Sequence, residues 1–221
     1  MPITSVTAVI INFQTPDLTQ RAFTSFRRWY PDLPLLLIDN GSADQSPALL
    51  RALAASSPAV NTLLCNARNL HHGPAMDQAM RHLTTDEVFF LDSDCIITTG
   101  GILERLSDAL HADDRNYAAG KRVFMNSRGF DVAPGPHAYP YIRPICMLIR
   151  RLPYATLSPF ARHGAPCLEN MKAATAAGLH LVHVPVEDYT HHEGRGTAGR
   201  FGYRLGWKGK WNHLLNRLGV R

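Results

Sequence analysis

Hydrophobic residues in the first hundred positions form short continuous runs. Between these runs lie longer segments in which hydrophobic residues recur every three or four positions. The runs at residues 5–12, 35–38, 60–64 and 88–91 are too short to be helix cores and are bounded by turn residues, which predicts buried strands. The intervening segments at 16–29, 46–55 and 74–82 have helical spacing, and Pro16 suits the first turn of a helix. Strands alternating with helices predict a mostly parallel α/β sheet covered on both faces.

The pattern weakens beyond Gly100. It predicts helices at 102–110 and 168–177 and strands at 145–149 and 179–185. Residues 129–144 are rich in Pro, Gly and aromatic side chains, so we predict a long loop or lid there. With no internal repeat and no clear linker, a single domain is expected.

The composition is that of an ordinary globular protein. The 221 residues are 45% hydrophobic and 19% charged, enough for one α/β domain with a substantial core. No apolar run is long enough to span a membrane, and the first residues lack a signal-peptide pattern. The four cysteines have neither CxxC nor zinc spacing. A cytoplasmic protein with reduced cysteines is therefore expected.

The net charge of +5 belongs to the end of the chain. Seven of the 23 Lys and Arg residues, and none of the 18 acidic residues, lie from Arg195 onward. Aromatic residues are interleaved with these charges, so the tail could contact an anionic membrane surface or a lipid-linked diphosphate. A solvated basic helix that closes over the phosphates of a bound ligand is the plainer alternative. Nucleic-acid binding is not expected, because no reader motif is present.

Two carboxylates follow the strand at 88–91, namely Asp92 and Asp94, separated by Ser93. Open α/β sheets bind ligands at the carboxyl ends of their strands. Two adjacent carboxylates repel each other unless a cation shares them, and Mg²⁺ or Mn²⁺ commonly bridges carboxylates to phosphates. The pattern predicts a metal–diphosphate site, whereas the alternative is a simple cap for the next helix.

Two further groups could join this site. Asp39 ends the second strand at the same sheet edge and could bind a base or a ribose, although it could also only cap a turn. His191 and His192 follow the last predicted strand, and Arg195 comes shortly after them. Imidazole can bind a divalent ion and Arg a phosphate. A solvated polar loop is the alternative for this segment.

Together these motifs resemble the family 2 glycosyltransferases, which have the GT-A fold. The resemblance runs from Val6 to about Gly196. It rests on the first strand ending at Asn12, the Asp-Asn-Gly-Ser segment from Asp39, the Asn-rich turn around Arg68, the DxD segment at 92–94, and Pro185 followed by His191 and His192.

The resemblance implies residue roles. Asn12, Asp39, Arg68, Asp92, Ser93 and Arg195 would bind a nucleotide-diphosphate sugar, and Asp94, His191 and His192 would bind Mn²⁺ or Mg²⁺. Residues 1–98 would form the nucleotide-sugar-binding half, 99–194 the acceptor half, and 195–221 a basic tail. The implied activity is metal-dependent, inverting transfer of a sugar to a hydroxyl of a glycan or lipid-linked acceptor. The tail could place the protein on the inner membrane face.

One departure from the family concerns the catalytic base. The family usually has Glu-Asp in the acceptor region, where this chain has Glu169 and Asn170. We predict Glu169 as the base. There are three alternatives: the base is Asp188 or Glu193, the reaction follows a different course, or the chain is a catalytically impaired nucleotide-sugar-binding protein.

Two other enzyme classes fit less well. A sugar nucleotidyltransferase would need a Gly-rich basic loop after the first strand, and residues 13–17 contain neither Gly nor a basic residue. A dinucleotide oxidoreductase would need a GxGxxG segment there.

Overall fold

The computed structural model describes residues 5–161 and 164–193. Their helices and strands follow one another along the chain in this order: β1 (Val6–Asn12), α1 (Pro16–Trp29), β2 (Leu35–Asp39), α2 (Ser46–Ala55), β3 (Asn61–Cys65), α3 (His72–His82), β4 (Glu87–Leu91), β5 (Cys95–Ile97), α4 (Ile102–His111), β6 (Asn116–Met125), β7 (Tyr139–Arg150), α5 (Arg151–Tyr154), α6 (Leu168–Ala176), β8 (His180–His183), the 3₁₀ helix η1 (Val186–Asp188) and β9 (Thr190–His192). The predicted tail and Arg195 lie outside the described residues.

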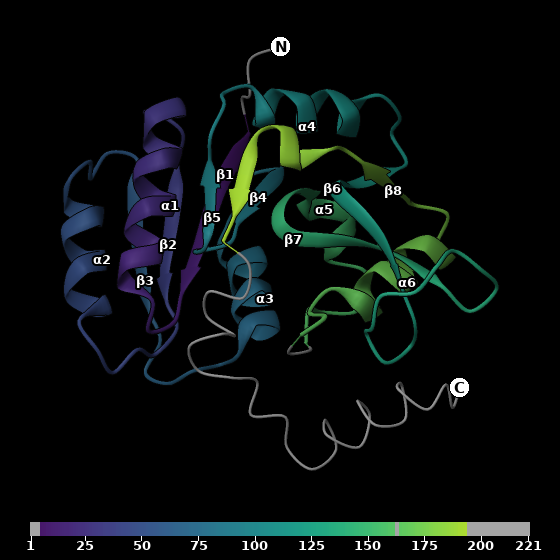
Figure 1. The fold of residues 1–221 in the computed structure, drawn as a ribbon, viewed down its shortest axis with the longest axis horizontal. Helices are drawn as coiled ribbons and strands as arrows, with labels where there is room; N and C mark the ends of the chain where they lie inside the picture. The colour runs from purple at the N-terminus through teal and green to yellow at the C-terminus, as the bar shows by residue number, and fades with distance from the viewer. Residues whose placement is uncertain (1–4, 162–163, 194–221) are drawn as a thin grey trace.

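A seven-stranded sheet runs through both predicted halves in the order β3-β2-β1-β4-β7-β6-β8 (Figure 1). Strands β3, β2, β1 and β4 are mutually parallel, and β8 is parallel to β6. Only β7 runs against its neighbours in this sheet of the described chain. The prediction of a mostly parallel α/β sheet is confirmed.

Helices cover both faces of this sheet because its strands alternate their side chains. Val9 and Ile11 of β1 pack on one face with Met76 of α3 and Met171 of α6. Ala8 and Ile10 pack on the other face with side chains of α1, α2 and α4. Burial on both faces explains why the strands are almost uniformly apolar.

The second half departs from the sequence expectations. Strand β6 was not predicted, and β7 already begins at Tyr139, inside the segment predicted to be a loop or lid. The β6–β7 pairing shifts register between Gly120 and Arg122, close to Pro144. A bulge accommodates a proline that cannot donate a ladder hydrogen bond.

The short strands β5 and β9 form a separate antiparallel pair, with Cys95 opposite His192. Neither strand was predicted, because three residues carry no readable period. The pair brings residues almost a hundred positions apart in sequence to the carboxyl edge of β4.

Gly41 supports the turn after β2. It has φ +75°, and a Cβ at this position would lie 2.2 Å from the carbonyl carbon of Arg68. We expect Gly41→Ala to lower the free energy of unfolding by about 2 to 4 kcal/mol, measured by urea denaturation, from strain and overlap combined. Gly178→Ala is the matched control, because Gly178 has φ +78° and open space around it. Equal losses in the two variants would show that the Arg68 contact costs nothing.

Candidate donor and metal site

Asp92 and Asp94, called the acid pair below, lie in the turn between β4 and β5. The Asp92 amide donates to the Ile145 carbonyl (3.0 Å) in β7, and the Cys95 amide donates to the Asp92 carbonyl (3.0 Å). Strand β5 follows at once, and Gly101 is the N-cap of α4, so neither aspartate caps that helix. The helix-cap alternative is therefore excluded.

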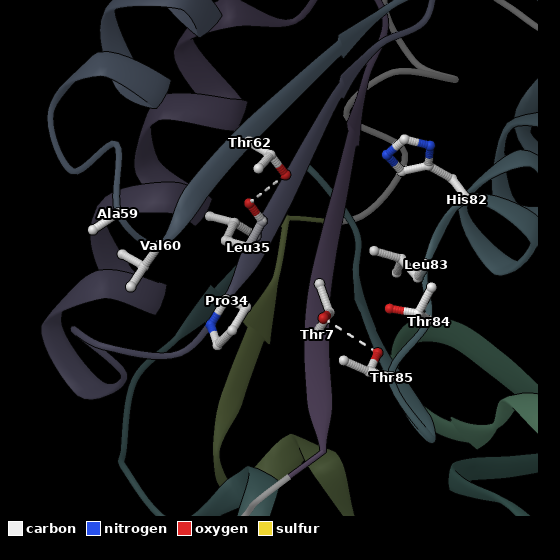
Figure 2. A pocket seen from close by; sticks show the side chains of 10 residues that line it. All are labelled: Thr7, Pro34, Leu35, Ala59, Val60, Thr62, His82, Leu83, Thr84 and Thr85. Carbon is white, nitrogen blue, oxygen red and sulfur yellow. Dashed lines mark hydrogen bonds between the residues drawn. The ribbon is translucent and has the colours of Figure 1, made fainter.

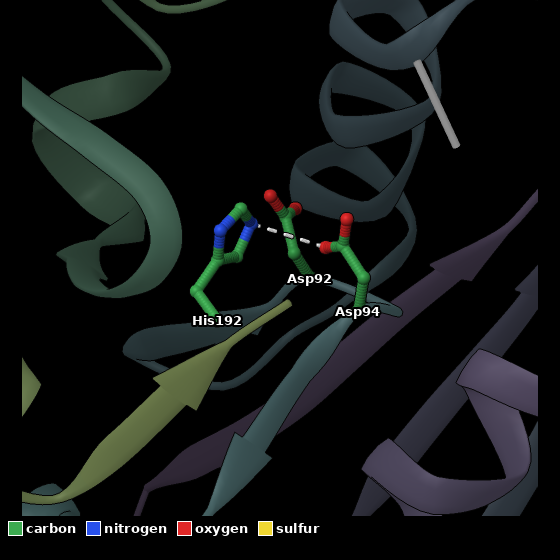
Figure 3. Close-up of side chains that lie close together, drawn as sticks. All are labelled: Asp92, Asp94 and His192. Carbon is green, nitrogen blue, oxygen red and sulfur yellow. Dashed lines mark ion pairs between the residues drawn. The ribbon is translucent and has the colours of Figure 1, made fainter. Parts of the chain in front are cut away.

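His192 completes a cluster with the two aspartates (Figure 3). Asp92, Asp94 and His192 each offer a ligand atom, and these atoms all lie within 4.8 Å of one another. His192 Nε2 is 3.2 Å from Asp94 Oδ1. Carboxylate oxygens and an imidazole nitrogen converge here from two segments far apart in sequence.

His191 lies outside this cluster. It is exposed and pairs with Ile96, and successive side chains of a strand point to opposite faces. Because His192 turns toward Asp94, the side chain of His191 turns away. Of the two histidines predicted to bind the metal, only His192 belongs to the cluster, and metal binding by either stays a prediction.

The charges in the cluster interact strongly. Burial raises the pKa of Asp92 above its usual value, the nearby imidazoles of His72 and His192 oppose that rise, and the Asp94 carboxylate adds to it. The hydrogen bond to Asp94 raises the pKa of His192. The repulsion between the Asp92 and Asp94 carboxylates contributes to the raised pKa of Asp92, and a bound cation would relieve that repulsion.

His72 is a neighbour that the sequence did not assign to the site. It begins α3, and its Nε2 lies 3.6 Å from Asp92 Oδ1. A histidine before a helix is ordinarily a surface residue, so its sequence position alone does not reveal this proximity. Only the tertiary structure, which brings the start of α3 next to Asp92, does so.

Asn12 is a buried residue that contacts Asp39. Asn12 is fully buried, and its amide nitrogen donates to Asp39 Oδ1 (3.2 Å) and to Ser42 Oγ (3.1 Å). Its amide oxygen accepts from Thr19 Oγ1 (2.8 Å). These bonds orient the turn that contains Asp39, and the predicted contact of Asn12 with the donor stays a prediction.

Asp39 lies at the same carboxyl edge as the acid pair, since β1 is parallel to both β2 and β4. Asp39 is 2% exposed, and its Oδ2 accepts from the Ser42 amide (3.3 Å). The turn contact proposed as its plainer role is therefore present, and nucleoside binding by Asp39 stays a prediction.

A network of amide side chains joins the loops after β2 and β3. Asn40 Oδ1 accepts from Asn66 Nδ2 and from the Leu70 amide, both at 3.1 Å. Asn66 in turn exchanges hydrogen bonds with Gln78 of α3. The network fixes the segment that presents the exposed Arg68, whereas Ser93 is buried within its own turn. Asn40 and Asn66 were not predicted as site residues.

The predicted base stands in the first turn of α6. Glu169 accepts a hydrogen bond from Lys172 Nζ at 3.0 Å, and its side chain is 41% exposed. The Lys172 ammonium also lies 4.6 Å from the centre of the Tyr139 ring. Glu169 is thus a partly exposed carboxylate paired with a lysine that lies over Tyr139, the first residue of β7.

Asn170 is a structural residue. It is fully buried, its Oδ1 accepts from the Tyr117 hydroxyl (2.8 Å), and its Nδ2 donates to the Ser158 carbonyl (2.7 Å). An aspartate here could not donate to Ser158 when ionised. The departure from Glu-Asp in this chain therefore accompanies a different, inward-facing role for position 170.

We expect Asn170→Asp to lower the free energy of unfolding by about 3 kcal/mol at neutral pH, because a buried carboxylate would face a carbonyl oxygen. Urea denaturation at neutral and at acidic pH tests this. Burial raises the pKa of the new carboxyl in the folded state, so the loss should shrink as the pH falls and the acid becomes a donor. A loss that does not depend on pH would contradict this account.

The other candidate bases lie in or next to β9. Asp188 ends η1, and Glu193 follows β9 and pairs with Arg21 of α1. The Arg21 pairing engages both carboxylate oxygens of Glu193, whereas Asp188 is exposed. The choice of Glu169 as the base therefore stays a prediction.

A groove of about 240 Å³ lies at the opposite edge of the sheet (Figure 2). Its lining residues are Thr7, Pro34, Leu35, Ala59, Val60, Thr62, His82, Leu83, Thr84 and Thr85. It touches the amino ends of β1, β2 and β3 and has no carboxylate in its lining, so it lacks the groups that hold a cation on a diphosphate.

Comparison with protein families identifies the class. The model of glycosyl transferase family 2 matches residues 7–168, and the chain belongs to that family. The match covers β1 to the start of α6, including the acid pair, and ends before β9 and His192. No curated protein sequence matches the chain.

Solved structures share the GT-A fold with this chain. They include the Pyrobaculum calidifontis mannosyltransferase PcManGT in complex with GDP-Man and Mn²⁺, with TM-score 0.65 and 19% identity over 82% of this chain and 55% of that one. GalNAc-T7 with UDP, GalNAc and Mn²⁺ has TM-score 0.66 and 13% identity, over 82% and 42% of the two chains. Glucosyl-3-phosphoglycerate synthase from Mycobacterium tuberculosis has TM-score 0.58 and 16% identity, over 98% and 81%. This chain therefore spans little more than half of the first of these proteins.

No helix among residues 5–161 and 164–193 is long and apolar enough to cross a membrane.

Proposed function

We propose that this chain transfers a sugar from a nucleotide-diphosphate donor to an acceptor hydroxyl in a metal-dependent, inverting reaction. The observation that carries the proposal is the convergence of Asp92, Asp94 and His192 at the carboxyl edge of β4. Ligands bind at this edge in open α/β sheets, and membership of glycosyl transferase family 2 agrees with it.

The donor set fits a divalent cation. Two carboxylates and one imidazole supply oxygen and nitrogen ligands at mutual distances that one ion can span. Carboxylates suit Mg²⁺ and Mn²⁺, whereas imidazole disfavours Mg²⁺ relative to transition ions, so Mn²⁺ is our first choice. When bound, such an ion offsets charge on the departing nucleoside diphosphate.

The nucleoside would be bound by the neighbouring loops. Asp39 and Asp92 would accept hydrogen bonds from base or ribose groups. The exposed guanidinium of Arg68 and the predicted contribution of Arg195 would bind anionic oxygens. Ser93 would contact the same nucleotide sugar from the turn between Asp92 and Asp94.

Glu169 would act as the base. Its carboxylate would accept the proton of the acceptor hydroxyl as that oxygen attacks the anomeric carbon. The bond from this carbon to the phosphate oxygen breaks, and the nucleoside diphosphate leaves with the electron pair. In-line attack inverts the configuration at the anomeric carbon. Lys172, 3.0 Å from Glu169, would orient the carboxylate before the acceptor arrives.

The acceptor is proposed to be a glycan or a lipid-linked hydroxyl, and the protein to be cytoplasmic, with the basic tail touching the inner membrane face. The charge and aromatic content of residues 195–221 support this part of the proposal. Flotation with anionic liposomes, using the whole chain and a chain ending at residue 194, tests it. Equal flotation of both would remove the tail from membrane contact.

A nucleotide-sugar-binding protein without transfer activity is the second candidate, because Asn170 replaces the acid usual in the family. Tight donor binding with neither hydrolysis nor transfer would favour it. Pyrophosphate release from a nucleoside triphosphate and a sugar phosphate would instead favour a nucleotidyltransferase.

A thermal-shift screen of nucleoside diphosphates tests donor binding directly. We expect one nucleotide to raise the melting temperature with Mn²⁺ present and much less without it, since ligands that bind the native state stabilise it by about 2.7 kcal/mol at 100 times their Kd. Inorganic phosphate with Mn²⁺ is the control. Identical melting with every nucleotide would reject the donor site.

A further inference from the structure

Strand β9 delivers His192 to the acid pair with little support of its own. It has three residues and, among the described residues, pairs with the equally short β5 alone. Its amino-terminal side is held by the Thr98 amide and hydroxyl, which donate to the Tyr189 carbonyl at 2.9 and 3.0 Å. A two-stranded ribbon this short is marginal by itself, so contacts at its other end decide where His192 stands.

Glu193 supplies those contacts. Its amide donates to the carbonyl of Asp94 at 3.0 Å. Its carboxylate forms a two-pronged ion pair with Arg21 of α1, in which Nη2 lies 2.6 Å from Oε2. Glu193 thus connects the end of β9 to the turn that contains Asp92 and Asp94 and to helix α1.

We propose that Arg21 and Glu193 form a clamp that positions His192 against Asp94. The inference rests on the proposed metal-dependent function and extends it to two residues that do not touch the reacting atoms. Arg21 and Glu193 are 172 positions apart in sequence, and the ion pair ties the end of β9 to a helix packed on the sheet.

An exposed ion pair often contributes little, and the Arg21 side chain is 49% exposed. Two features set this pair apart. The guanidinium engages both carboxylate oxygens, which fixes an orientation as well as a distance. The Glu193 side chain is only 22% exposed, and its own amide is bonded to the acid turn. Release of the carboxylate therefore loosens the residue next to His192.

The clamp and a simple field effect predict opposite changes in cation affinity when the positive charge of Arg21 is removed. Loss of a positive charge near an acidic cluster should strengthen cation binding slightly if only the long-range field matters. Loss of a clamp should weaken it, because His192 would be less well placed. The direction of the change therefore separates the two explanations.

The experiment compares Arg21→Gln with the wild type in two measurements. Hydrogen exchange of the metal-free protein follows the amides of residues 186–193, and titration calorimetry measures Mn²⁺ affinity. We expect exchange about fivefold faster and a Kd for Mn²⁺ about fivefold higher. Arg28→Gln is the matched control. Arg28 is also exposed on α1, but its guanidinium stacks on Trp29, whereas Arg21 forms an ion pair with Glu193. It should leave both measurements within about twofold of the wild type.

The paired exchange Arg21→Glu with Glu193→Arg should restore part of both properties, and Arg21→Lys should give an intermediate value, since lysine keeps the charge without the fork. Unchanged exchange in Arg21→Gln, or tighter Mn²⁺ binding, would overturn the clamp. If the wild type itself binds no Mn²⁺, the metal proposal fails, and the exchange data still decide whether the clamp exists.

Discussion

Replacement of Asp94 by Asn is expected to lower donor turnover about 100- to 1000-fold and to abolish its dependence on Mn²⁺. The substitution keeps the shape of the side chain but removes one of the two charges that share the cation. Loss of a group that stabilises developing charge in a protein site typically costs this much. Steady-state kinetics across a Mn²⁺ series, with a donor chosen from the thermal-shift screen, measures both effects.

Asp108→Asn is the control for Asp94→Asn. Asp108 is exposed on α4, away from the cluster, and the substitution makes the same chemical change. Its kinetics should match the wild type. If Asp94→Asn retains full Mn²⁺-dependent turnover, Asp94 is not a metal ligand in this protein.

Replacement of Glu169 by Gln is expected to lower kcat about 100-fold while the Kd for the donor stays nearly constant. Glutamine has the size of glutamate but cannot take a proton from the acceptor hydroxyl, and a positioned general base typically contributes this factor or more. Single-turnover kinetics gives the chemical step, and calorimetry gives donor binding. The two readings together separate loss of a base from loss of the donor site.

Glu187→Gln is the matched control for Glu169→Gln. Glu187 is also a partly exposed carboxylate beside a lysine, with Lys121 Nζ at 3.6 Å. An unchanged kcat in Glu169→Gln would remove Glu169 as the base and direct attention to Asp188. A parallel loss of donor affinity would instead assign Glu169 a binding role.

The first half of the fold could be predicted closely because its signals are local. Helix α1 runs from Pro16 to Trp29 and α2 from Ser46 to Ala55, as the spacing and the prolines indicate. Strands β1, β2 and β4 are buried on both faces, so their apolar runs are nearly continuous, whereas the edge strand β3 was predicted to be buried and is partly exposed. In the second half, β6 contains Gly120, Lys121 and Arg122, and its pairing with β7 and β8 overrides that weak local preference.

The candidate site divides in the same way. Asp92 and Asp94 stand directly after an apolar strand, so their location at the sheet edge is local information. The choice between His191 and His192 depends on which face of β9 lies against the turn that contains Asp94. The sequence does not show which of two neighbouring histidines is on that face. The inward role of Asn12 is likewise invisible until Asp39 and Ser42 are placed around it.

The sequence by itself determined the parallel sheet of the first half, the acid pair at its carboxyl edge and the family resemblance. Each of these can be read from short continuous segments, because the order of apolar and polar residues within a segment indicates its secondary structure. Tertiary structure alone decided that His192 and not His191 meets Asp94, that His72 lies beside Asp92, and that Arg21 reaches Glu193. Those contacts join segments between 20 and 172 positions apart, and only the packing of helices on a common sheet determines which distant side chains meet.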